Sequence, residues 1–187
     1  MNEISVSGLV KIILCYSVVL FVSGVVKVEI LLSVVDETLL YSARVSSYMT
    51  LLITVSLTFI TIMFLLGLPW FVLQYIKSSL PLKTFLHASH YFIYALVANE
   101  ILKIGLLFIF LKNEAKSITM DFDFQQQLTS TVWYQLNRTL DIAAIFISSF
   151  AFGWTIKIEA DQNRSIDIVL STGLIFAILF TFYMANT

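Results

Sequence analysis

The chain has 187 residues, of which 59% are apolar and 12% are charged, and its mean hydropathy is +0.92. Soluble domains are typically about 45–50% apolar and about 25% charged, so this composition excludes an ordinary water-soluble domain. The formal net charge of −1 provides no basic field that would favour nucleic acid, and the single cysteine excludes an internal disulfide or a multi-cysteine metal site.

Five apolar stretches follow one another along the chain. A bilayer core about 30 Å thick is crossed by a helix of roughly 20 apolar residues. Each stretch reaches this length and is apolar almost throughout, unlike the alternating strands of a membrane β-barrel. The sequence therefore predicts an all-α integral membrane protein, with five transmembrane helices in one compact bundle and a single domain over residues 1–187. The predicted spans are about 7–32, 48–76, 88–111, 137–156 and 166–184.

The first span lies close to the N-terminus, where a signal peptide is the alternative. A signal peptide needs a basic start, an uninterrupted apolar stretch and small residues before its cleavage site. Here Glu3 lies in the first residues, Lys11 interrupts the apolar stretch, and no A-x-A pattern follows. We interpret the segment as a retained helix, on which Ser7, Lys11 and Cys15 form a short polar stripe.

The connections between spans differ in length. "KSSLPLKTF" (77–85) and "KIEADQNRS" (157–165) are short, which predicts tight hairpins between spans two and three and between spans four and five. The other two, "SVVDETLLYSARVSS" and "KNEAKSITMDFDFQQQLTSTVW", are long enough for short interfacial helices. Lysine and arginine are divided almost evenly between short and long connections, so the positive-inside rule is close to a tie. We place both short connections in the cytoplasm, which gives a cytoplasmic N-terminus and a C-terminus on the opposite side.

Charged residues occur inside the third span, "HASHYFIYALVANEILKIGLLFIF". Glu100 and Lys103 are three residues apart, which puts them on one face of a helix. Pairing offsets part of the cost of burying either charge in lipid, so we interpret the pair as a salt bridge that faces the other helices. The alternative is that Glu100 is a proton or ligand site inside the bundle.

The fourth span repeats this spacing with Arg138 and Asp141. Arg138 can extend its charge to the interface. Asp141 begins a stripe that continues with Ala144, Ser148 and Ala151, and small residues let helices approach closely in lipid. We interpret the stripe as a packing surface, with a functional site at Asp141 as the alternative.

His87 and His90 are the only histidines, and their spacing would allow a shared metal. No other candidate ligand lies nearby in sequence, since Glu100 is about three turns away. The H-E-x-x-H, G-x-S-x-G, G-x-G-x-x-G and P-loop motifs are all absent. The sequence therefore predicts neither a metal site, a cofactor nor an enzyme.

Two segments resemble the Yip1 family of five-span membrane proteins. The residues that carry the resemblance are "LDIAAIFISSFAFGWTIKIEADQNRSIDIVLSTGLIFAIL" (140–179) and "PLKTFLHASHYFIYALVANEILKIG" (81–105), and the resemblance extends over about half of the chain. The resemblance implies a five-helix bundle without catalysis that acts through protein partners, in membrane traffic or beside transporters. The third span lacks the family's proline, and the long N-terminal region of eukaryotic members is missing, which favours a bacterial member in the inner membrane.

Three functions follow from these patterns. The first is a non-enzymatic accessory or assembly subunit of a membrane complex for transport, secretion or trafficking, with other membrane subunits as partners. The sequence does not determine the number of subunits. The alternative is a small proton-coupled transporter that uses Glu100 and Lys103. A membrane enzyme acting on lipid, with His87, His90 and Glu100 as its site, ranks third.

Overall fold

The computed structural model describes residues 5–35, 37–78, 80–115, 124–159 and 165–185. Helices dominate these ranges, and no strand occurs in them. Five helices are long and apolar enough to cross a membrane, as the sequence predicts. The chain is therefore a helical, multi-pass integral membrane protein.

The third of the five long helices is continued by two short helical pieces. The elements are α1 (Val6–Leu32), α2 (Glu37–Tyr75), α3 (Leu82–Leu106), the π-helix η1 (Leu107–Leu111), α4 (Lys112–Glu114), α5 (Phe124–Ser130), α6 (Val132–Glu159) and α7 (Ser165–Ala185). Because η1 and α4 extend α3, the third spanning segment runs without a break from Leu82 to Glu114.

The second helix is longer than the sequence predicts. α2 begins at Glu37 rather than near residue 48, because "ETLLYSARVSS" is rich in good helix formers and carries an acid in its first turn. Its 39 residues correspond to about 58 Å, more than the about 40–45 Å of a whole bilayer. One end of α2 therefore lies outside the hydrocarbon core, and most of the predicted first connection is helical.

The third and fourth spans also begin earlier than predicted. α3 starts at Leu82, directly after Pro81, whose φ of −64° suits a helix start. α6 starts at Val132, and the carboxylate of Glu114 accepts hydrogen bonds from the backbone N–H groups of Val132 (3.1 Å) and Trp133 (3.2 Å). These bonds satisfy amides that a helix leaves unpaired at its start.

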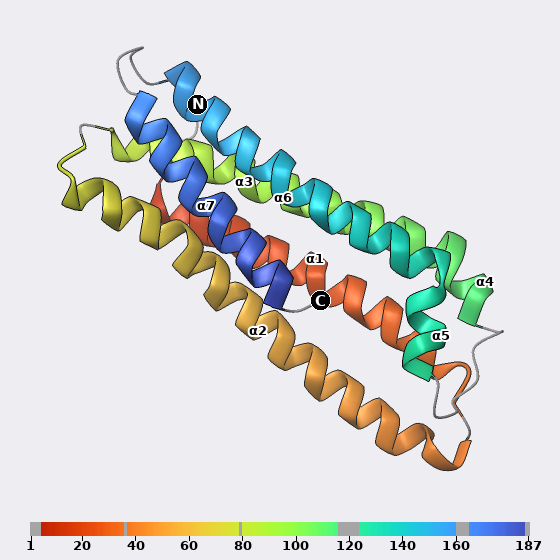
Figure 1. Cartoon of the computed structure of the whole chain (residues 1–187). Coiled ribbons are helices and arrows are strands. Elements are labelled where there is room, and N and C mark those ends of the chain that lie inside the picture. The colour runs from red at the N-terminus through yellow and green to blue at the C-terminus, as the bar shows by residue number, and fades with distance from the viewer. Residues whose placement is uncertain (1–4, 36, 79, 116–123, 160–164, 186–187) are drawn as a thin grey trace.

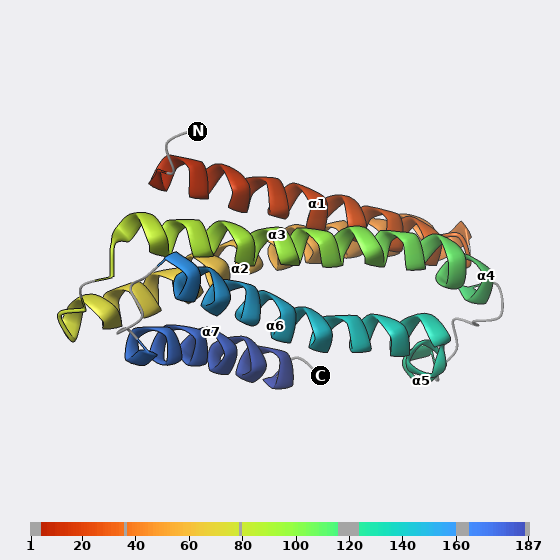
Figure 2. The same ribbon diagram turned by 90° about the horizontal axis from the view of Figure 1, so that it is seen from above.

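The helices pack around α3. Figure 2 shows α3 between α1 and α6, and it packs against both. α7 packs against α6 and α2, and α2 packs against α1. Large apolar side chains fill the interior: Phe92 and Phe152 are fully buried, and Phe85 meets Phe152 edge to face with ring centroids 5.4 Å apart.

The last helix is the shortest of the five. α7 has 21 residues, about 31 Å, and ends partway along α6 (Figures 1 and 2). Near this end, Arg138 Nε on α6 donates a hydrogen bond of 3.0 Å to the Tyr183 hydroxyl on α7. Both α2 and α6 continue past this point (Figure 1).

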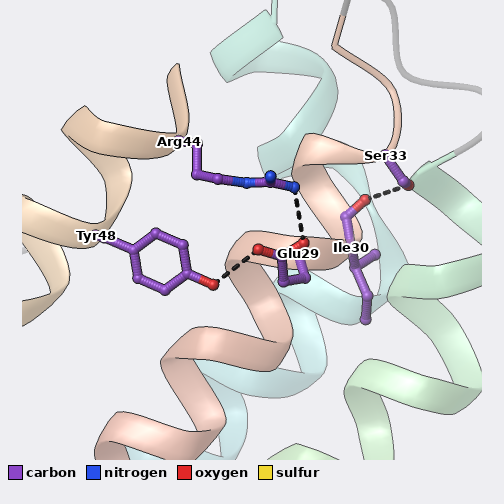
Figure 3. A network of polar contacts seen from close by, with 5 residues as sticks. All are labelled: Glu29, Ile30, Ser33, Arg44 and Tyr48. Carbon is purple, nitrogen blue, oxygen red and sulfur yellow. Dashed lines mark hydrogen bonds and ion pairs between the residues drawn. The ribbon is translucent and has the colours of Figure 1, made fainter. Parts of the chain in front are cut away.

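A polar network joins the end of α1 to the beginning of α2 (Figure 3). Glu29 accepts hydrogen bonds from Arg44 Nη2 at 3.3 Å and from the Tyr48 hydroxyl at 2.7 Å. We call these three residues the Glu29 network. The side chains of Glu29 and Arg44 are about half exposed, so this contact lies at the surface of the chain.

Candidate functional site: an acidic cavity between the helices

The charges of the third span meet a charge of the fourth. Lys103 Nζ on α3 lies 2.9 Å from Glu100 Oε1 and also forms an ion pair with Asp141 on α6. Lys103 thus joins two carboxylates, one on its own helix and one on the neighbouring helix. We call Glu100, Lys103 and Asp141 the charge triad.

The charge triad is largely shielded from the surroundings. The side chains of Lys103 and Glu100 are 13% and 7% exposed, and that of Asp141 is 31% exposed. Charges in the apolar part of a membrane protein are costly unless they are paired. The ion pair between Lys103 and Asp141 therefore ties α3 to α6, but two acids and one base leave a net charge of −1 in the triad.

Polar neighbours extend the triad along α6. Asn137 Nδ2 donates a hydrogen bond of 3.3 Å to Asp141 Oδ2. Arg138, predicted to extend toward the interface, bonds to the Tyr183 hydroxyl rather than to Asp141. The i, i+3 spacing of Arg138 and Asp141 is therefore not used as an ion pair.

A cavity of about 290 Å³ opens beside the charge triad. All five long helices contribute to its wall, and it lies where α7 ends. It is partly open to the surroundings. The lining residues are Tyr16, Thr58, Thr61, Ile62, Leu65, Leu96, Asn99, Glu100, Asp141, Ala144, Ile145, Leu179, Phe182 and Tyr183. Two carboxylates line the cavity, and none of these residues is basic.

Two buried polar side chains in this wall were not singled out from the sequence. Tyr16 is 7% exposed and Asn99 is 9% exposed, yet both line the cavity. In the part of the chain that the structure describes, neither the Tyr16 hydroxyl nor the Asn99 side-chain amide has a hydrogen-bond partner. A signal existed for Asn99, since it precedes Glu100 inside an apolar span; Tyr16 resembles many other aromatic residues of the spans.

The polar stripe predicted on the first span faces outward. Ser7, Lys11 and Cys15 are all exposed. Tyr16, one position after Cys15, is the buried α1 residue that lines the cavity. The polar stripe and the cavity-lining residue therefore lie on different faces of α1.

The two histidines lie apart from the cavity. His87 pairs with Glu159 at the end of α6. His90 is buried, and its Nε2 lies near Gly8 of α1. Neither residue lines the cavity with Glu100, and no group of three potential metal ligands occurs among the described residues. His87, His90 and Glu100 therefore do not meet as a single site.

The small-residue stripe of the fourth span contributes to packing as well as to the cavity. Ser148 is fully buried, and its hydroxyl donates to the Ala144 carbonyl at 2.6 Å. Ala144 is also buried and lines the cavity beside Asp141. The stripe is thus buried at Ala144 and Ser148 and partly exposed at its two ends, Asp141 and Ala151.

Comparison with protein-family models, with curated proteins and with solved structures finds no match. The class of multi-pass helical membrane protein therefore rests on the five spanning helices alone. The resemblance to the Yip1 family remains a prediction from the sequence.

Proposed function

We propose that this protein is a non-enzymatic accessory or assembly subunit of a membrane complex that serves transport, secretion or trafficking. In this proposal, the five spans form one compact bundle with tight hairpins between spans two and three and between spans four and five. The proposed location is a bacterial inner membrane with a cytoplasmic N-terminus. The Yip1 resemblance implies the same kind of role through protein partners.

The observation that supports this function is a row of threonines on α2. Thr50, Thr54, Thr58 and Thr61 lie within about 80° around the helix, and we call them the threonine stripe. Thr58 and Thr61 line the cavity, whereas Thr50 and Thr54 are exposed.

The exposed half of the threonine stripe is suited to contact with another helix. Thr50 and Thr54 donate their hydroxyl protons to carbonyls one turn earlier on α2, each at 2.9 Å. Their polar atoms are thereby satisfied, and a small surface remains that lets a second helix approach closely in lipid. A helix of a partner subunit is the proposed occupant.

Site-specific crosslinking tests this function in native membranes. A photoreactive residue replaces Thr54 in one variant and Leu52 in the matched control, which is exposed about 160° away around the same helix. We expect one discrete adduct from position 54, of the same mass as a subunit that co-purifies in mild detergent. Equal crosslinking from both positions, together with a monomer that co-purifies with nothing, would contradict the proposal.

The cavity favours a second candidate, a small proton-coupled transporter. Glu100 and Asp141 line a space that reaches the surroundings, so a proton or a substrate has access to a carboxylate. Glu100→Gln should then abolish proton flux into dye-loaded proteoliposomes under a membrane potential. Glu29→Gln, which alters a carboxylate in the Glu29 network, is the control and should leave the flux unchanged. An unchanged flux in Glu100→Gln would eliminate this candidate.

A further inference from the structure

We propose that the cavity beside the charge triad binds a small organic ammonium ion. This site goes beyond the role of an accessory subunit and does not depend on it. The proposal rests on three independent features of the wall, which are its charge, its unpartnered polar groups and its apolar surface.

The charged side chains that line the cavity are both acidic. Glu100 and Asp141 line the cavity, and Lys103 behind them neutralises only one of the two carboxylates. Lys27 on α1 is a second lysine within electrostatic reach of Asp141, but its ammonium lies over the Trp133 ring, 5.0 Å from the centroid, and Lys27 does not line the cavity. No basic residue lines the cavity, so a monovalent cation inside it would be the positive charge that contacts these two carboxylates from the cavity side, and pairing lowers the cost of charges in an apolar region.

Two polar side chains in the cavity wall are available to hydrogen-bond to a ligand. Tyr16 and Asn99 are each more than nine-tenths buried as residues, both line the cavity, and their side-chain polar groups have no protein partner within the described ranges. Buried polar groups in proteins almost always form hydrogen bonds, and an unmet one costs about 1–3 kcal/mol. A ligand with N–H donors can bond to the Tyr16 oxygen and to the Asn99 carbonyl oxygen.

The same carboxylates already accommodate an ammonium group. Lys103 presents a primary ammonium to both Glu100 and Asp141, so their spacing suits N–H donors. A bare metal ion would need a larger set of oxygen ligands. No group of three His, Cys, Asp or Glu ligands occurs among the described residues.

Apart from Thr58, Thr61 and Tyr183, the rest of the wall is apolar and partly aromatic. Leu65, Leu96 and Ile145 line the cavity, and so does the Phe182 ring. Aromatic faces attract organic cations, and hydrocarbon side chains favour an organic substituent on the nitrogen. The volume of about 290 Å³ is at the lower end for small-molecule sites, which limits the ligand to a small amine.

The ammonium group has two natural sources, a dissolved amine or the headgroup of an aminophospholipid. The test therefore begins with protein in nanodiscs of phosphatidylcholine, which carries no primary amine. The probe is 2-phenylethylammonium, titrated by calorimetry. Its matched controls are 2-phenylethanol, which lacks the charge, and phenylacetate, which reverses it.

We expect saturable binding of 2-phenylethylammonium at least tenfold tighter than binding of the alcohol, and no saturable binding of the anion. Equal affinity for the ammonium and the alcohol, or no saturable binding of the ammonium, would overturn the proposal. Repeating the titration with phosphatidylethanolamine in the nanodisc identifies the source. A weakened apparent affinity supports a headgroup ligand, and an unchanged affinity supports a dissolved amine.

Variants that keep the charge triad intact locate the probe. Asn99→Leu and Tyr16→Phe remove one polar group each and should weaken binding at least fivefold. Ala144→Phe fills the cavity and should abolish binding. Glu29→Gln, outside the cavity, should leave the affinity unchanged. Wild-type affinity in all three cavity variants, with helix content preserved, would place the probe elsewhere and overturn the proposal.

Discussion

Glu29 and Arg44 form an ion pair between α1 and α2, and Lys103 and Asp141 form one between α3 and α6. The side chains of Glu29 and Arg44 are 46% and 48% exposed, whereas those of Lys103 and Asp141 are 13% and 31% exposed. The same chemistry therefore occurs in two different surroundings. The exposed pair joins helices at the surface, and the buried pair combines helix contact with the wall of a cavity.

Burial decides what each pair contributes. An exposed ion pair is worth about 0–1 kcal/mol, because the surroundings screen the charges and the side chains lose freedom. Removing one partner of a buried pair costs about 3–5 kcal/mol, because it leaves an uncompensated charge. Mutations in the charge triad should therefore lower the free energy of unfolding more than mutations in the exposed ion pair.

The largest effect is expected from removing the shared cation of the triad. Lys103→Met keeps the length of the side chain but leaves the carboxylates of Glu100 and Asp141 facing each other. We expect a loss of about 3–5 kcal/mol in the free energy of unfolding. Arg44→Met in the exposed pair should cost less than about 1 kcal/mol. Far-UV circular dichroism during dodecyl sulfate titration of the protein in mild detergent measures both.

Equal losses of unfolding free energy in Lys103→Met and Arg44→Met would show that burial does not distinguish the two ion pairs. If Lys103→Met failed to insert or fold while Arg44→Met folded normally, the difference between the two ion pairs would be larger than expected. Wild-type helix content in Arg44→Met is the control, because it shows that the loss of one positive charge does not by itself prevent folding.

The two carboxylates of the triad are expected to substitute for each other in part. Glu100→Gln or Asp141→Asn leaves Lys103 with one anionic partner, so each should cost about 1–3 kcal/mol. The double variant leaves the ammonium unpaired and should cost more than the sum of the single losses. A double-mutant cycle by the same titration measures this coupling. Strict additivity would mean that Lys103 does not bridge the two acids.

Two glycines lie where neighbouring helices pack closely, one between α6 and α7 and one between α1 and α2. A Cβ on Gly153 of α6 would lie 2.5 Å from Thr172 Oγ1 of α7, and threonine is stiff in a helix. A Cβ on Gly24 of α1 would meet the end of the flexible Leu51 side chain of α2. We expect Gly153→Ala to cost about 1–3 kcal/mol and Gly24→Ala less than about 1 kcal/mol.

Thermal unfolding in mild detergent tests the glycine pair, with both variants measured under one set of conditions. A larger loss for Gly24→Ala than for Gly153→Ala would show that α1 and α2 are held more rigidly than α6 and α7. The expected order is the reverse, because a leucine methyl can rotate away, whereas Thr172 Cγ2 and Cβ would also lie 3.1 and 3.3 Å from the added Cβ of Gly153.

The number of spanning helices could be predicted from the sequence because hydropathy over about 20 residues determines it. The true start of α2 could not, because "ETLLYSARVSS" is too polar to resemble a span. It is helical because its residues favour helix and because Arg44 and Tyr48 contact Glu29 on α1. Hydropathy detects membrane crossing, whereas helix propensity and tertiary contact set where a helix begins.

The candidate site was predictable only in part, for a similar reason. The spacing of Glu100 and Lys103 predicts their ion pair, whereas Asp141 lies on another span with no sequence link to either residue. Which helix lies beside α3 depends on tertiary packing, and the sequence therefore gave no sign that Lys103 bridges to Asp141. Tyr16 and Asn99 became recognisable only when their shared cavity was known.

Salt provides the smallest and most selective test of the difference between the two regions. One end of α2 must lie outside the hydrocarbon core because of its length, and we assign this to the more polar first turns, "ETLLYSARVSS". Arg44 of the Glu29 network belongs to these turns, and Tyr48 follows directly after them. Charges in contact with water are screened, with a Debye length of about 10 Å at 0.1 M salt and about 3 Å at 1 M. The stabilisation lost in Glu29→Gln should therefore be less than about 1 kcal/mol and should shrink as salt rises.

The charge triad should respond differently, since shielded pairs are screened much less. The loss in Asp141→Asn should stay constant from 0.1 M to 1 M potassium chloride, measured by the same dodecyl sulfate titration and corrected for the response of the wild type. If the Glu29→Gln loss were equally independent of salt, the Glu29 network would lie in lipid rather than water, and the exposed fractions of the two pairs would no longer distinguish their surroundings.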